Sequence, residues 1–309
     1  MRLMSRLTNK TAIIGIGLIG SSFARAIKDA SGGEVVGFDQ SPDVRARAVA
    51  CGAVDAAAAS FGDAVSDADL IVVSTPVGAV PEVLRNIVEK AKAGALVIDV
   101  GSVKGAVVEA AAGLGPRVHI VPCHPVAGTE LSGPEAGFSA LFKDRWTIIT
   151  PLKRNDEAYL DAVKRAADLW RAVGSNVEIM DHQHHDLALA ITSHLPHLIA
   201  FTLVGAAYDL ESVAEAEIIK YSAGGFRDFT RIAASDPVMW RDVFLNNRAA
   251  VLEVLGRFTE ELALLQRAIR WGDAETLERV FRRGRELRRA IVAAGQEIDV
   301  PNFGRDEKT

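Results

Sequence analysis

A histidine between two prolines is the residue of this sequence best placed to do chemistry. Pro122-Cys123-His124-Pro125 follows an apolar run, residues 118–121, that predicts a buried strand. Each proline fixes its own φ and restricts the residue before it, so His124 has little backbone freedom. Open α/β sheets bind ligands beyond their strand ends, and a neutral imidazole there can accept a proton. The alternative, for this motif alone, is a turn that contains a hydrogen-bonded histidine.

A glycine motif near the N-terminus predicts a dinucleotide site. An apolar run, residues 11–16, meets Gly15-x-Gly17-x-x-Gly20, and a helical stretch follows. The glycines permit a tight turn and let a pyrophosphate approach the start of the helix, at Leu18 and Ile19. The alternative is a glycine-rich turn that binds nothing, which the flanking strand and helix disfavour.

An acidic residue after the next predicted strand indicates which dinucleotide to expect. Asp39 lies 19 residues after Gly20, where a carboxylate can accept hydrogen bonds from a ribose hydroxyl pair. The same charge repels a 2′-phosphate, and the residues that follow, Gln40-Ser41-Pro42, supply no arginine to reverse this. We therefore expect NAD as the cofactor, with NADP disfavoured.

Apolar runs alternate with alanine-rich and charged segments through the first half of the chain. The predicted strands cover residues 11–16, 34–38, 70–75, 96–100, 118–121 and 147–150. Continuous apolar strands separated by helices are typical of a parallel sheet that is covered on both faces. The sequence therefore predicts an α/β fold with a Rossmann-type, doubly wound parallel sheet.

Three of these strands run into polar loops, which are Ser74-Thr75-Pro76, Gly101-Ser102-Val103-Lys104 and Cys123-His124-Pro125. The loops after parallel strands emerge at one edge of a sheet, so we expect Ser102 and His124 beside the glycine turn. The first loop would line the cofactor groove. Alternatively, Ser102 only caps the next helix, and Lys104 is a solvated charge.

After a last predicted strand, residues 177–180, the pattern becomes helical to the end of the chain. We expect a nucleotide-binding domain over residues 1–181 and an all-α dimerisation and substrate domain over residues 182–309. The cluster Asp181-His182-Gln183-His184-His185-Asp186 contains ligand types suited to zinc or iron. Consecutive helical residues point in different directions, however, so we favour polar residues at a helix start over a metal site.

Two motifs of the helical half carry candidate binding residues. His194-Leu-Pro-His197 lies in an apolar helical pattern that Pro196 should kink, although a buried histidine satisfied within the core is the commoner case. Arg227 and Arg231 are spaced to share one helix face, and a guanidinium binds a carboxylate bidentately. Arg231 has apolar neighbours, which favours a buried site, and the alternative is a charged surface patch that includes Asp228.

The last long helical pattern suggests a partner for the chain. Asp236-Pro237 predicts a capped helix start, and Gly272 predicts its end after Trp271. A helix of that length, with apolar residues at helical spacing, is too long for a lone small domain to cover. We expect a homodimer formed through the helical half.

Composition excludes several other classes of protein. The chain has 309 residues, a formal net charge of −5 and two cysteines, Cys51 and Cys123. The charge gives no reason to expect nucleic acid or an anionic membrane. Two cysteines make no disulfide framework, so we expect a protein of the reducing cytoplasm. We find no apolar run long enough to span a bilayer and no apolar signal core in the first ten residues.

Five motifs, taken together and in this order, resemble the prephenate and arogenate dehydrogenases of tyrosine biosynthesis. They are Gly15-Ile-Gly-Leu-Ile-Gly20, Asp99-Val-Gly-Ser-Val-Lys-Gly105, His124-Pro-Val-Ala-Gly-Thr-Glu130, His194-Leu-Pro-His197 and Gly224-Gly-Phe-Arg-Asp-Phe-Thr-Arg231. The resemblance implies a Rossmann-type domain and a helical dimerisation domain. It also implies an NAD-dependent oxidoreductase that decarboxylates prephenate or arogenate oxidatively, yielding 4-hydroxyphenylpyruvate or tyrosine.

The resemblance implies roles for single residues. His124 resembles the histidine that hydrogen-bonds the ring hydroxyl of the substrate, and Ser102 resembles the serine that assists it. Arg231 resembles the arginine that holds the ring carboxylate. The residues that resemble the lining of the substrate pocket are His197, Gly224, Trp240 and Thr129. Arg227 stands where some relatives have lysine, so its contact with the substrate is left open.

Two further domains occur in some members of the family, and two other classes of protein are alternatives to it. We expect no chorismate mutase segment before the nucleotide domain, and no regulatory ACT domain after about residue 294. A β-hydroxyacid dehydrogenase or imine reductase shares this two-domain plan but usually carries a lysine early in its second domain, and residues 181–219 contain none. A non-catalytic NAD-binding protein is the other alternative. The sequence leaves open the choice between prephenate and arogenate and any feedback by tyrosine.

Overall fold

The computed structural model describes residues 8–129, 131–209 and 224–293. By its internal contacts the chain forms two compact units, residues 1–252 and 253–309, which we describe separately. Glu130 and the chain after residue 293, each part of an expectation above, lie outside the described residues.

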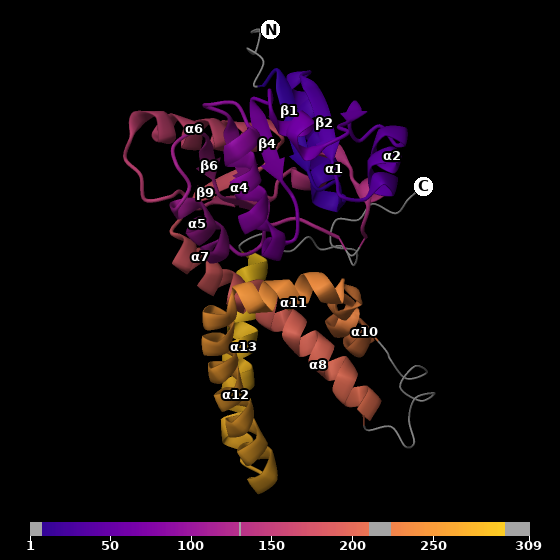
Figure 1. The fold of residues 1–309 in the computed structure, drawn as a ribbon. Helices are drawn as coiled ribbons and strands as arrows, with labels where there is room; N and C mark the ends of the chain where they lie inside the picture. The colour runs from indigo at the N-terminus through magenta and orange to yellow at the C-terminus, as the bar shows by residue number, and fades with distance from the viewer. Residues whose placement is uncertain (1–7, 130, 210–223, 294–309) are drawn as a thin grey trace. The chain divides into compact units, whose positions relative to one another are not determined.

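The first unit is built on a six-stranded parallel sheet of order β3-β2-β1-β4-β5-β6 (Figure 1). Its strands are β1 (Lys10–Ile14), β2 (Glu34–Phe38), β3 (Ala56–Ala57), β4 (Leu70–Val73), β5 (Leu96–Asp99) and β6 (His119–Val121). The helices between them are α1 (Leu18–Ser31), α2 (Pro42–Ala50), α3 (Phe61–Val65), α4 (Val80–Lys90) and α5 (Gly105–Ala112). The doubly wound sheet predicted from the apolar runs is confirmed.

Alternating residues of each strand enter two separate apolar cores. In β1, for example, Ile13 belongs to one buried cluster, and Ala12 and Ile14 belong to the other. Successive side chains of a strand point to opposite faces, so each face of the sheet has its own core. Helices α1 and α6 (Glu157–Ala172) contribute to the first core, and α4 and α5 contribute to the second.

A second, three-stranded sheet follows, of order β7-β8-β9. It consists of β7 (Cys123–Pro125), β8 (Trp146–Ile149) and β9 (Asn176–Ile179), with β7 antiparallel to β8. The strand near residues 147–150 therefore does not extend the parallel sheet as predicted, the strand predicted at 177–180 joins it in the second sheet, and His124 lies in a short strand instead of a loop. Pro122 explains the break, because it has no N–H for the β5–β6 ladder, while its carbonyl accepts the N–H of Thr150 at 2.9 Å.

The helical half begins with α7 (His182–Leu189), whose start is capped by the Asp181 side chain. A π-helical turn (Ala190–His194) and α8 (Leu195–Asp209) continue it. The disturbance expected from Pro196 thus takes the form of a wider turn, because proline lacks the N–H that an α-helical bond one turn back requires.

One expectation about membranes needs correction. The continuous helical stretch His182–Tyr208 has 27 residues and contains an 18-residue window with a mean hydropathy of 1.7, so it could cross a bilayer by length and composition alone. It contains the buried polar residues His185, Asp186 and His194, whose hydrogen bonds to other elements are described below. Such bonds hold the first part of this stretch against its neighbours in the first unit.

The single long helix predicted after Pro237 is two helices. α11 (Pro237–Asn246) is capped by Asp236 as predicted, and α12 (Arg248–Trp271) ends at Gly272, whose φ is +68°. Between them Asn247 leaves the helical conformation. Its side chain is buried and forms hydrogen bonds. Two shorter elements, α10 (Gly224–Thr230) and a 3₁₀ turn (Arg231–Ala234), precede α11.

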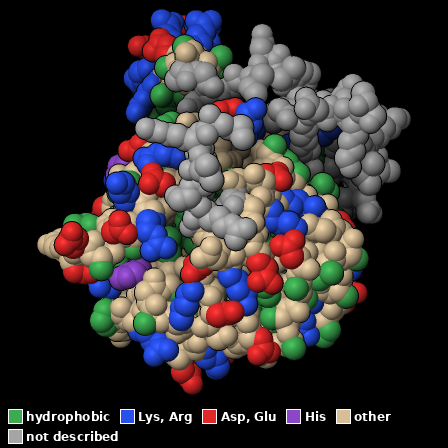
Figure 2. All heavy atoms as spheres, turned by 90° about the horizontal axis from the view of Figure 1, so that it is seen from above, with side chains coloured by type: hydrophobic (Ala, Val, Ile, Leu, Met, Phe, Trp, Pro, Cys, Tyr) green, Lys and Arg blue, Asp and Glu red, His purple; other side chains and the backbone are tan. Residues whose placement is uncertain are grey.

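Both units expose charged and large apolar side chains. On the face seen in Figure 2, basic and acidic side chains are interspersed, in keeping with the modest net charge. The second unit holds most of α12 and all of α13 (Ala274–Ala293). It exposes several large apolar side chains, namely Leu262, Ile269, Trp271, Phe281, Leu287, Ile291 and Val292.

Candidate active site

The glycine turn between β1 and α1 has the geometry of a pyrophosphate site. Gly15 has a φ of +90°, and a Cβ there would lie 2.6 Å from the Ser74 carbonyl oxygen. A Cβ at Gly20 would lie 2.2 Å from the Gly15 oxygen. By contrast, a Cβ at Gly17 would meet nothing within 4 Å, and no side chain caps the helix there. The open space and the uncapped N–H groups at Leu18, Ile19 and Gly20 fit a bound phosphate.

The carboxylate of Asp39 lies at the same turn. It accepts hydrogen bonds from the main-chain N–H of Ile16 and of Ser41, both at 3.0 Å. Arg45, six residues on, donates to the Asp39 carbonyl at 2.7 Å and lies over the Phe38 ring. Sequence inspection stopped at Pro42, so it missed an arginine that the first turn of α2 brings back to Asp39.

The loop after β4 adjoins this turn, because β4 pairs directly with β1. The Ser74 hydroxyl donates to the Gly15 carbonyl, which ties the two loops together. The Thr75 hydroxyl is buried and has no partner among the described residues, and Pro76 is exposed. An unpartnered buried hydroxyl at this edge is a group that a bound cofactor could satisfy.

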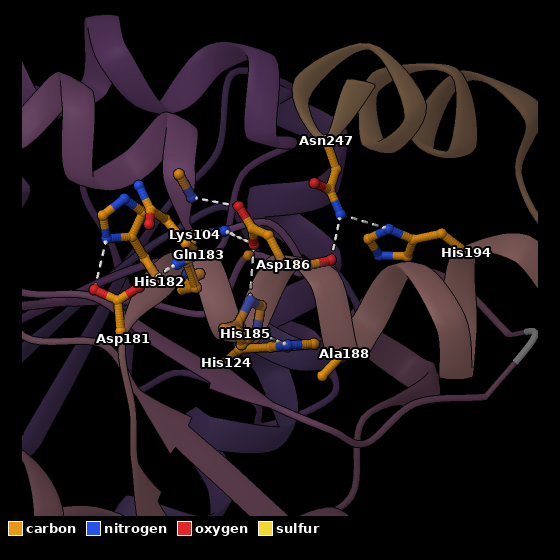
Figure 3. A network of polar contacts seen from close by, with 12 residues as sticks. Lys104, His124, Asp181, His182, Gln183, His185, Asp186, Ala188, His194 and Asn247 are labelled. Atoms are coloured by element: carbon orange, nitrogen blue, oxygen red, sulfur yellow. Dashed lines mark hydrogen bonds and ion pairs between the residues drawn. The ribbon is translucent and has the colours of Figure 1, made fainter. Parts of the chain in front are cut away.

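His124 is the end of a buried hydrogen-bond network in which Asp186 joins the most partners (Figure 3). Its Nδ1 lies 2.8 Å from Nε2 of His185, and Nδ1 of His185 lies 2.8 Å from Oδ1 of Asp186. The carboxylate of Asp186 also accepts the main-chain N–H groups of Lys104 and Gly105, each at 2.8 Å. The network therefore joins β7 to α7 and to the start of α5.

The charge states of this network follow from its burial. Burial lowers the pKa of His124 well below its usual value, and the nearby His185, Lys104 and His194 lower it further. Burial also lowers the pKa of His185, although Asp186 opposes this. For Asp186, burial alone would raise the pKa, but hydrogen bonds from His185, Lys104 and Gly105 hold it below its usual value. At neutral pH the carboxylate is charged and both imidazoles are neutral.

Lys104 is fully buried and is not the solvated charge considered above. Its ammonium group pairs with Asp99 and donates to the carbonyl of Cys123 at 2.6 Å. Asp99 in turn accepts the main-chain N–H groups of Gly101 and Cys123. This ion pair fixes the backbone on both sides of the site, at the Ser102 loop and at the residue before His124. Ser102 itself is half-buried.

His194 and Asn247 extend the network on the helical side. The Asn247 amide donates to the Asp186 carbonyl at 2.8 Å and lies 3.0 Å from Nδ1 of His194. Burial lowers the pKa of His194 to about 4, so the ring is neutral and its Nδ1 accepts this bond. Its proton is then on Nε2, which is buried and without a partner among the described residues.

Trp240 connects His194 to His197. Trp240 stacks on His197 with ring centroids 3.6 Å apart, and the His194 ring lies 6.0 Å away, edge-on. The Trp240 indole N–H is a second buried donor without a partner in the described part of the chain. Trp240 also packs with Val77 and Val103, next to Ser102. These contacts bring α8 and α11 to the loops at the edge of the sheet.

Arg231 is near His197 but is not in the buried, apolar setting expected from its neighbours. Burial lowers the pKa of His197, a hydrogen bond with the Ser193 carbonyl opposes this, and the charge of Arg231 lowers it further. The Arg231 side chain is exposed, and so is Phe229. α10 ends at Thr230, so Arg227 and Arg231 do not share one α-helical face; Arg227 forms an exposed ion pair with Asp228.

The remaining candidates lie at the surface. Thr129 is half-buried, and its hydroxyl accepts the main-chain N–H of Leu131 at 3.2 Å. Gly224 is exposed at the first position of α10. In the described part of the chain, no group of three or more histidine, cysteine, aspartate or glutamate side chains is arranged to hold a metal ion.

Sequence inspection missed His185, Asp186 and Asn247. His185 and Asp186 were interpreted as polar residues at a helix start. That interpretation is right for Asp181, which caps α7, but His185 and Asp186 are buried inside the protein. A signal was present, because His185 and Asp186 precede Leu189 and Ala190 by four residues, and so lie on the helix face that those apolar residues bury.

Two family models match the chain. The nucleotide-binding domain of prephenate dehydrogenase matches residues 23–179, and the dimerization domain of prephenate dehydrogenase matches residues 181–283.

Individual relatives are similar over almost the whole chain. The cyclohexadienyl dehydrogenase of Zymomonas mobilis is 41% identical over 281 residues, which are 91% of this chain and 95% of the relative. The prephenate dehydrogenase of Bacillus subtilis is 33% identical over 306 residues, 97% of this chain and 80% of the relative. The solved structure of Aquifex aeolicus prephenate dehydrogenase with hydroxyphenyl propionate and NAD⁺ has 35% identity and a TM-score of 0.82, covering 94% of this chain and 100% of that one.

A glycine turn on a parallel sheet, an acid at the end of the second strand and a buried neutral histidine just beyond the end of β6 are features of an NAD-dependent dehydrogenase. The helical half contributes buried histidines of its own, His185 and His194, which distinguishes this chain within the dehydrogenases. The chain belongs to the prephenate dehydrogenase family. The resemblance seen in the five motifs and the Rossmann-type fold with a helical second half are thereby confirmed, and the family's nucleotide-binding and dimerization domains agree with the expected dinucleotide cofactor and homodimer.

Proposed function

We propose that this protein decarboxylates prephenate or arogenate oxidatively, with NAD⁺, in tyrosine biosynthesis. The products would be 4-hydroxyphenylpyruvate or tyrosine, together with CO₂ and NADH. One observation carries the proposal: a buried, neutral histidine, His124, lies three residues beyond the carboxyl end of β6, a strand of the sheet that also carries the dinucleotide turn. The names of the relatives supply the substrate class, a cyclohexadienol that carries a ring carboxylate.

His124 would act as the general base. Bound NAD⁺ would supply the acceptor for the hydride that leaves C4 of the substrate ring. The hydroxyl proton on C4 must be accepted as the carbonyl forms, and a neutral imidazole is suited to that at pH 7. Loss of CO₂ from C1 then restores aromaticity, a large driving force that needs little help from the protein. Ser102, on the neighbouring loop, would assist the same hydroxyl.

The helical half would bind the rest of the substrate. Arg231 would hold the ring carboxylate, because a guanidinium matches a carboxylate with two parallel hydrogen bonds. His197 donates Nδ1–H to the Ser193 carbonyl, which leaves Nε2 of the neutral ring as an acceptor. The unpartnered N–H groups of His194 and Trp240 are donors for substrate oxygens. Thr129, Gly224 and Arg227 would complete the rim of the pocket.

The cofactor would lie along the edge formed by β1, β2 and β4. Its pyrophosphate would meet the open space at Gly17 and the N–H groups that follow, and Asp39 would accept the ribose hydroxyls. The loop at residues 74–76 would cover it. We assign residues 1–181 to the nucleotide-binding domain and residues 182–309 to the helical domain; the two family models meet between residues 179 and 181, which supports this division.

We place the enzyme in the cytoplasm. Both free cysteines among the described residues, Cys51 and Cys123, fit a reducing compartment. The apolar stretch His182–Tyr208 falls in the residues that match the family's dimerization domain, so a second copy of the chain is the expected cover for its exposed side chains.

A rate assay tests the proposal. Purified protein is mixed with NAD⁺ and either prephenate or arogenate, with and without tyrosine, and the absorbance of the reduced cofactor is followed. Turnover of either substrate supports the proposal, and the ratio of kcat/KM values decides which is preferred. Turnover of a 3-hydroxy acid alone would support a β-hydroxyacid dehydrogenase, and NAD⁺ binding without any turnover would support a non-catalytic protein. His124→Asn is the matched control, because the variant should bind NAD⁺ normally.

A further inference from the structure

We infer that His185 and Asp186 are positioning residues that set the tautomer of His124 and share the charge that it acquires. The inference rests on the proposed role of His124 as the base. It goes further by assigning a function to two residues of α7 that do not themselves face the reacting atoms. The observations are two imidazole contacts of 2.8 Å and the burial of all three side chains.

The direction of the hydrogen bonds follows from Asp186. A carboxylate only accepts, so Nδ1 of His185 must carry the proton in its bond to Oδ1 of Asp186. Because His185 is neutral at pH 7, its Nε2 is then an acceptor. The bond between His185 Nε2 and His124 Nδ1 therefore needs the proton on His124 Nδ1. This leaves Nε2 of His124 unprotonated, which is the form that a general base requires.

The position of Asp186 is itself fixed. Its two carboxylate oxygens accept the first main-chain N–H groups at the start of α5, at Lys104 and Gly105. Its main-chain carbonyl accepts the Asn247 amide. A Cβ on Gly105 would lie 2.9 Å from Oδ2, so glycine at that position lets the carboxylate approach. The orientation of His124 is thus set by α5 and by the break between α11 and α12.

Charge sharing is the second consequence. When His124 accepts the substrate proton it becomes a buried cation, which is costly unless it is paired. Its Nδ1–H already donates to His185, whose other nitrogen donates to the anionic Asp186, so negative charge is present one ring away. The other charged groups nearby are Lys104 and Asp99, which neutralise each other in an ion pair, and His194 is neutral. The relay therefore offers His124 a nearby unneutralised carboxylate.

The tautomer can be read directly by NMR, without turnover. In protein labelled with ¹⁵N-histidine, one- and two-bond couplings distinguish a protonated from an unprotonated ring nitrogen. We expect Nδ1 of His124 to be protonated and Nε2 unprotonated in the wild type near pH 7. In His185→Leu, which removes the acceptor, the two tautomers of His124 should mix. A wild-type spectrum with the proton on Nε2 would overturn the inference, whatever the substrate proves to be.

Kinetics test the consequence for catalysis. His185→Leu should lower kcat about 10- to 100-fold with substrate KM within about 3-fold of wild type, because the tautomer is no longer enforced. His185→Gln, whose side-chain oxygen can accept from His124 Nδ1, should recover most of that loss. The exposed neighbour His184 supplies the matched control, His184→Gln, which should be indistinguishable from wild type.

The outcomes separate this inference from the proposed function. Wild-type turnover of prephenate or arogenate with an unaltered kcat in His185→Leu overturns the relay and leaves the proposed function intact. Equal losses in the Leu and Gln variants would likewise overturn it, since a purely structural role predicts no rescue. If the wild type turns over neither substrate, the proposed function fails, while the spectrum still decides the tautomer.

Discussion

At the scale of single residues, the site depends on a histidine that burial keeps neutral. His124→Asn keeps a hydrogen-bonding side chain but removes the base. We expect kcat to fall about 10²- to 10⁴-fold with substrate KM almost unchanged, because the proton acceptor acts mainly in the transition state. Steady-state kinetics with saturating NAD⁺ measure both constants. An unchanged kcat in this variant would exclude His124 as the base.

Arg231 supports a different prediction, on affinity. Its side chain is exposed, so its bond to a carboxylate is in part screened by solvent. We expect Arg231→Ala to raise substrate KM by about 10- to 100-fold, equivalent to about 1.5–3 kcal/mol for lost charge-assisted hydrogen bonds, with a smaller effect on kcat. Arg257→Ala is the matched control, since Arg257 is exposed, pairs with Glu253 at the surface and has no role in the proposed pocket. If both variants titrate like the wild type, the carboxylate is held by other groups.

At the scale of elements, the turn between β1 and α1 separates glycines needed by the fold from one needed by the ligand. A Cβ at Gly20 would lie 2.2 Å from the Gly15 oxygen and 2.3 Å from the Ser74 hydroxyl oxygen, whereas a Cβ at Gly17 would meet nothing. We expect Gly20→Ala to lower the free energy of unfolding by more than about 2 kcal/mol. Gly17→Ala should stay within about 1 kcal/mol of wild type yet weaken NAD⁺ binding at least about 10-fold, because the methyl group occupies the pyrophosphate space.

Urea unfolding and calorimetric titration with NAD⁺ measure these two effects on the same samples. Normal NAD⁺ affinity in Gly17→Ala would mean that the pyrophosphate does not approach the backbone at this turn.

The sequence predicted elements well where apolar periodicity alone determines them. All six apolar runs of the first half became strands, because a strand buried on both faces reads as a continuous apolar run. It failed where one side chain or one missing N–H decides between structures. Pro122 moves the later strands into a second sheet, and Asn247 interrupts a strongly periodic helix with hydrogen bonds to Asp186 and His194. Both partners of Asn247 lie more than fifty residues away, which a local pattern does not encode.

The sequence predicted only part of the candidate site, because the contacts of its other residues are between segments far apart in the chain. Parallel strands bring the loops at Gly15, Ser74 and Ser102 to one edge, so their grouping follows from topology. His185 and Asp186 are ordinary residues at the start of a helix until packing buries them against β7 and α5. Arg231 was expected to be buried because of its neighbours, but Phe229 is itself half-exposed, at 52%.

At the scale of the whole molecule, the buried histidines make stability depend on pH. His124, His185, His194 and His197 all have pKa values lowered by burial. Each of these histidines binds a proton more readily in the unfolded protein than in the folded one. Its contribution to the free energy of unfolding is therefore complete above about pH 6.5 and is lost as the pH falls. For His194, with a folded pKa of about 4, the loss between pH 7 and pH 5 is about 2 kcal/mol.

Urea unfolding at pH 7 and pH 5 measures this loss. We expect the wild type to lose at least about 2 kcal/mol over that range. His194→Leu should lose correspondingly less over the same range, whatever its stability at pH 7. An equal loss in both proteins would show that His194 is not a source of the pH dependence.

Exposed apolar side chains of the second unit predict how the dimer forms. Its helices α12 and α13 leave Ile269, Trp271 and Phe281 more than 60% exposed, and the residues to 283 match the family's dimerization domain. Burying one such side chain contributes about 1.5–3 kcal/mol, so a charge in its place should weaken association strongly. We expect Ile269→Glu/Phe281→Glu to shift the mass in analytical ultracentrifugation from twice 33.0 kDa toward 33.0 kDa at low micromolar concentration. Arg282→Gln, a change at an exposed charge beside Phe281, should remain dimeric. A dimer that survives the double substitution at every dilution would place the interface on apolar side chains of the first unit, such as those of α8.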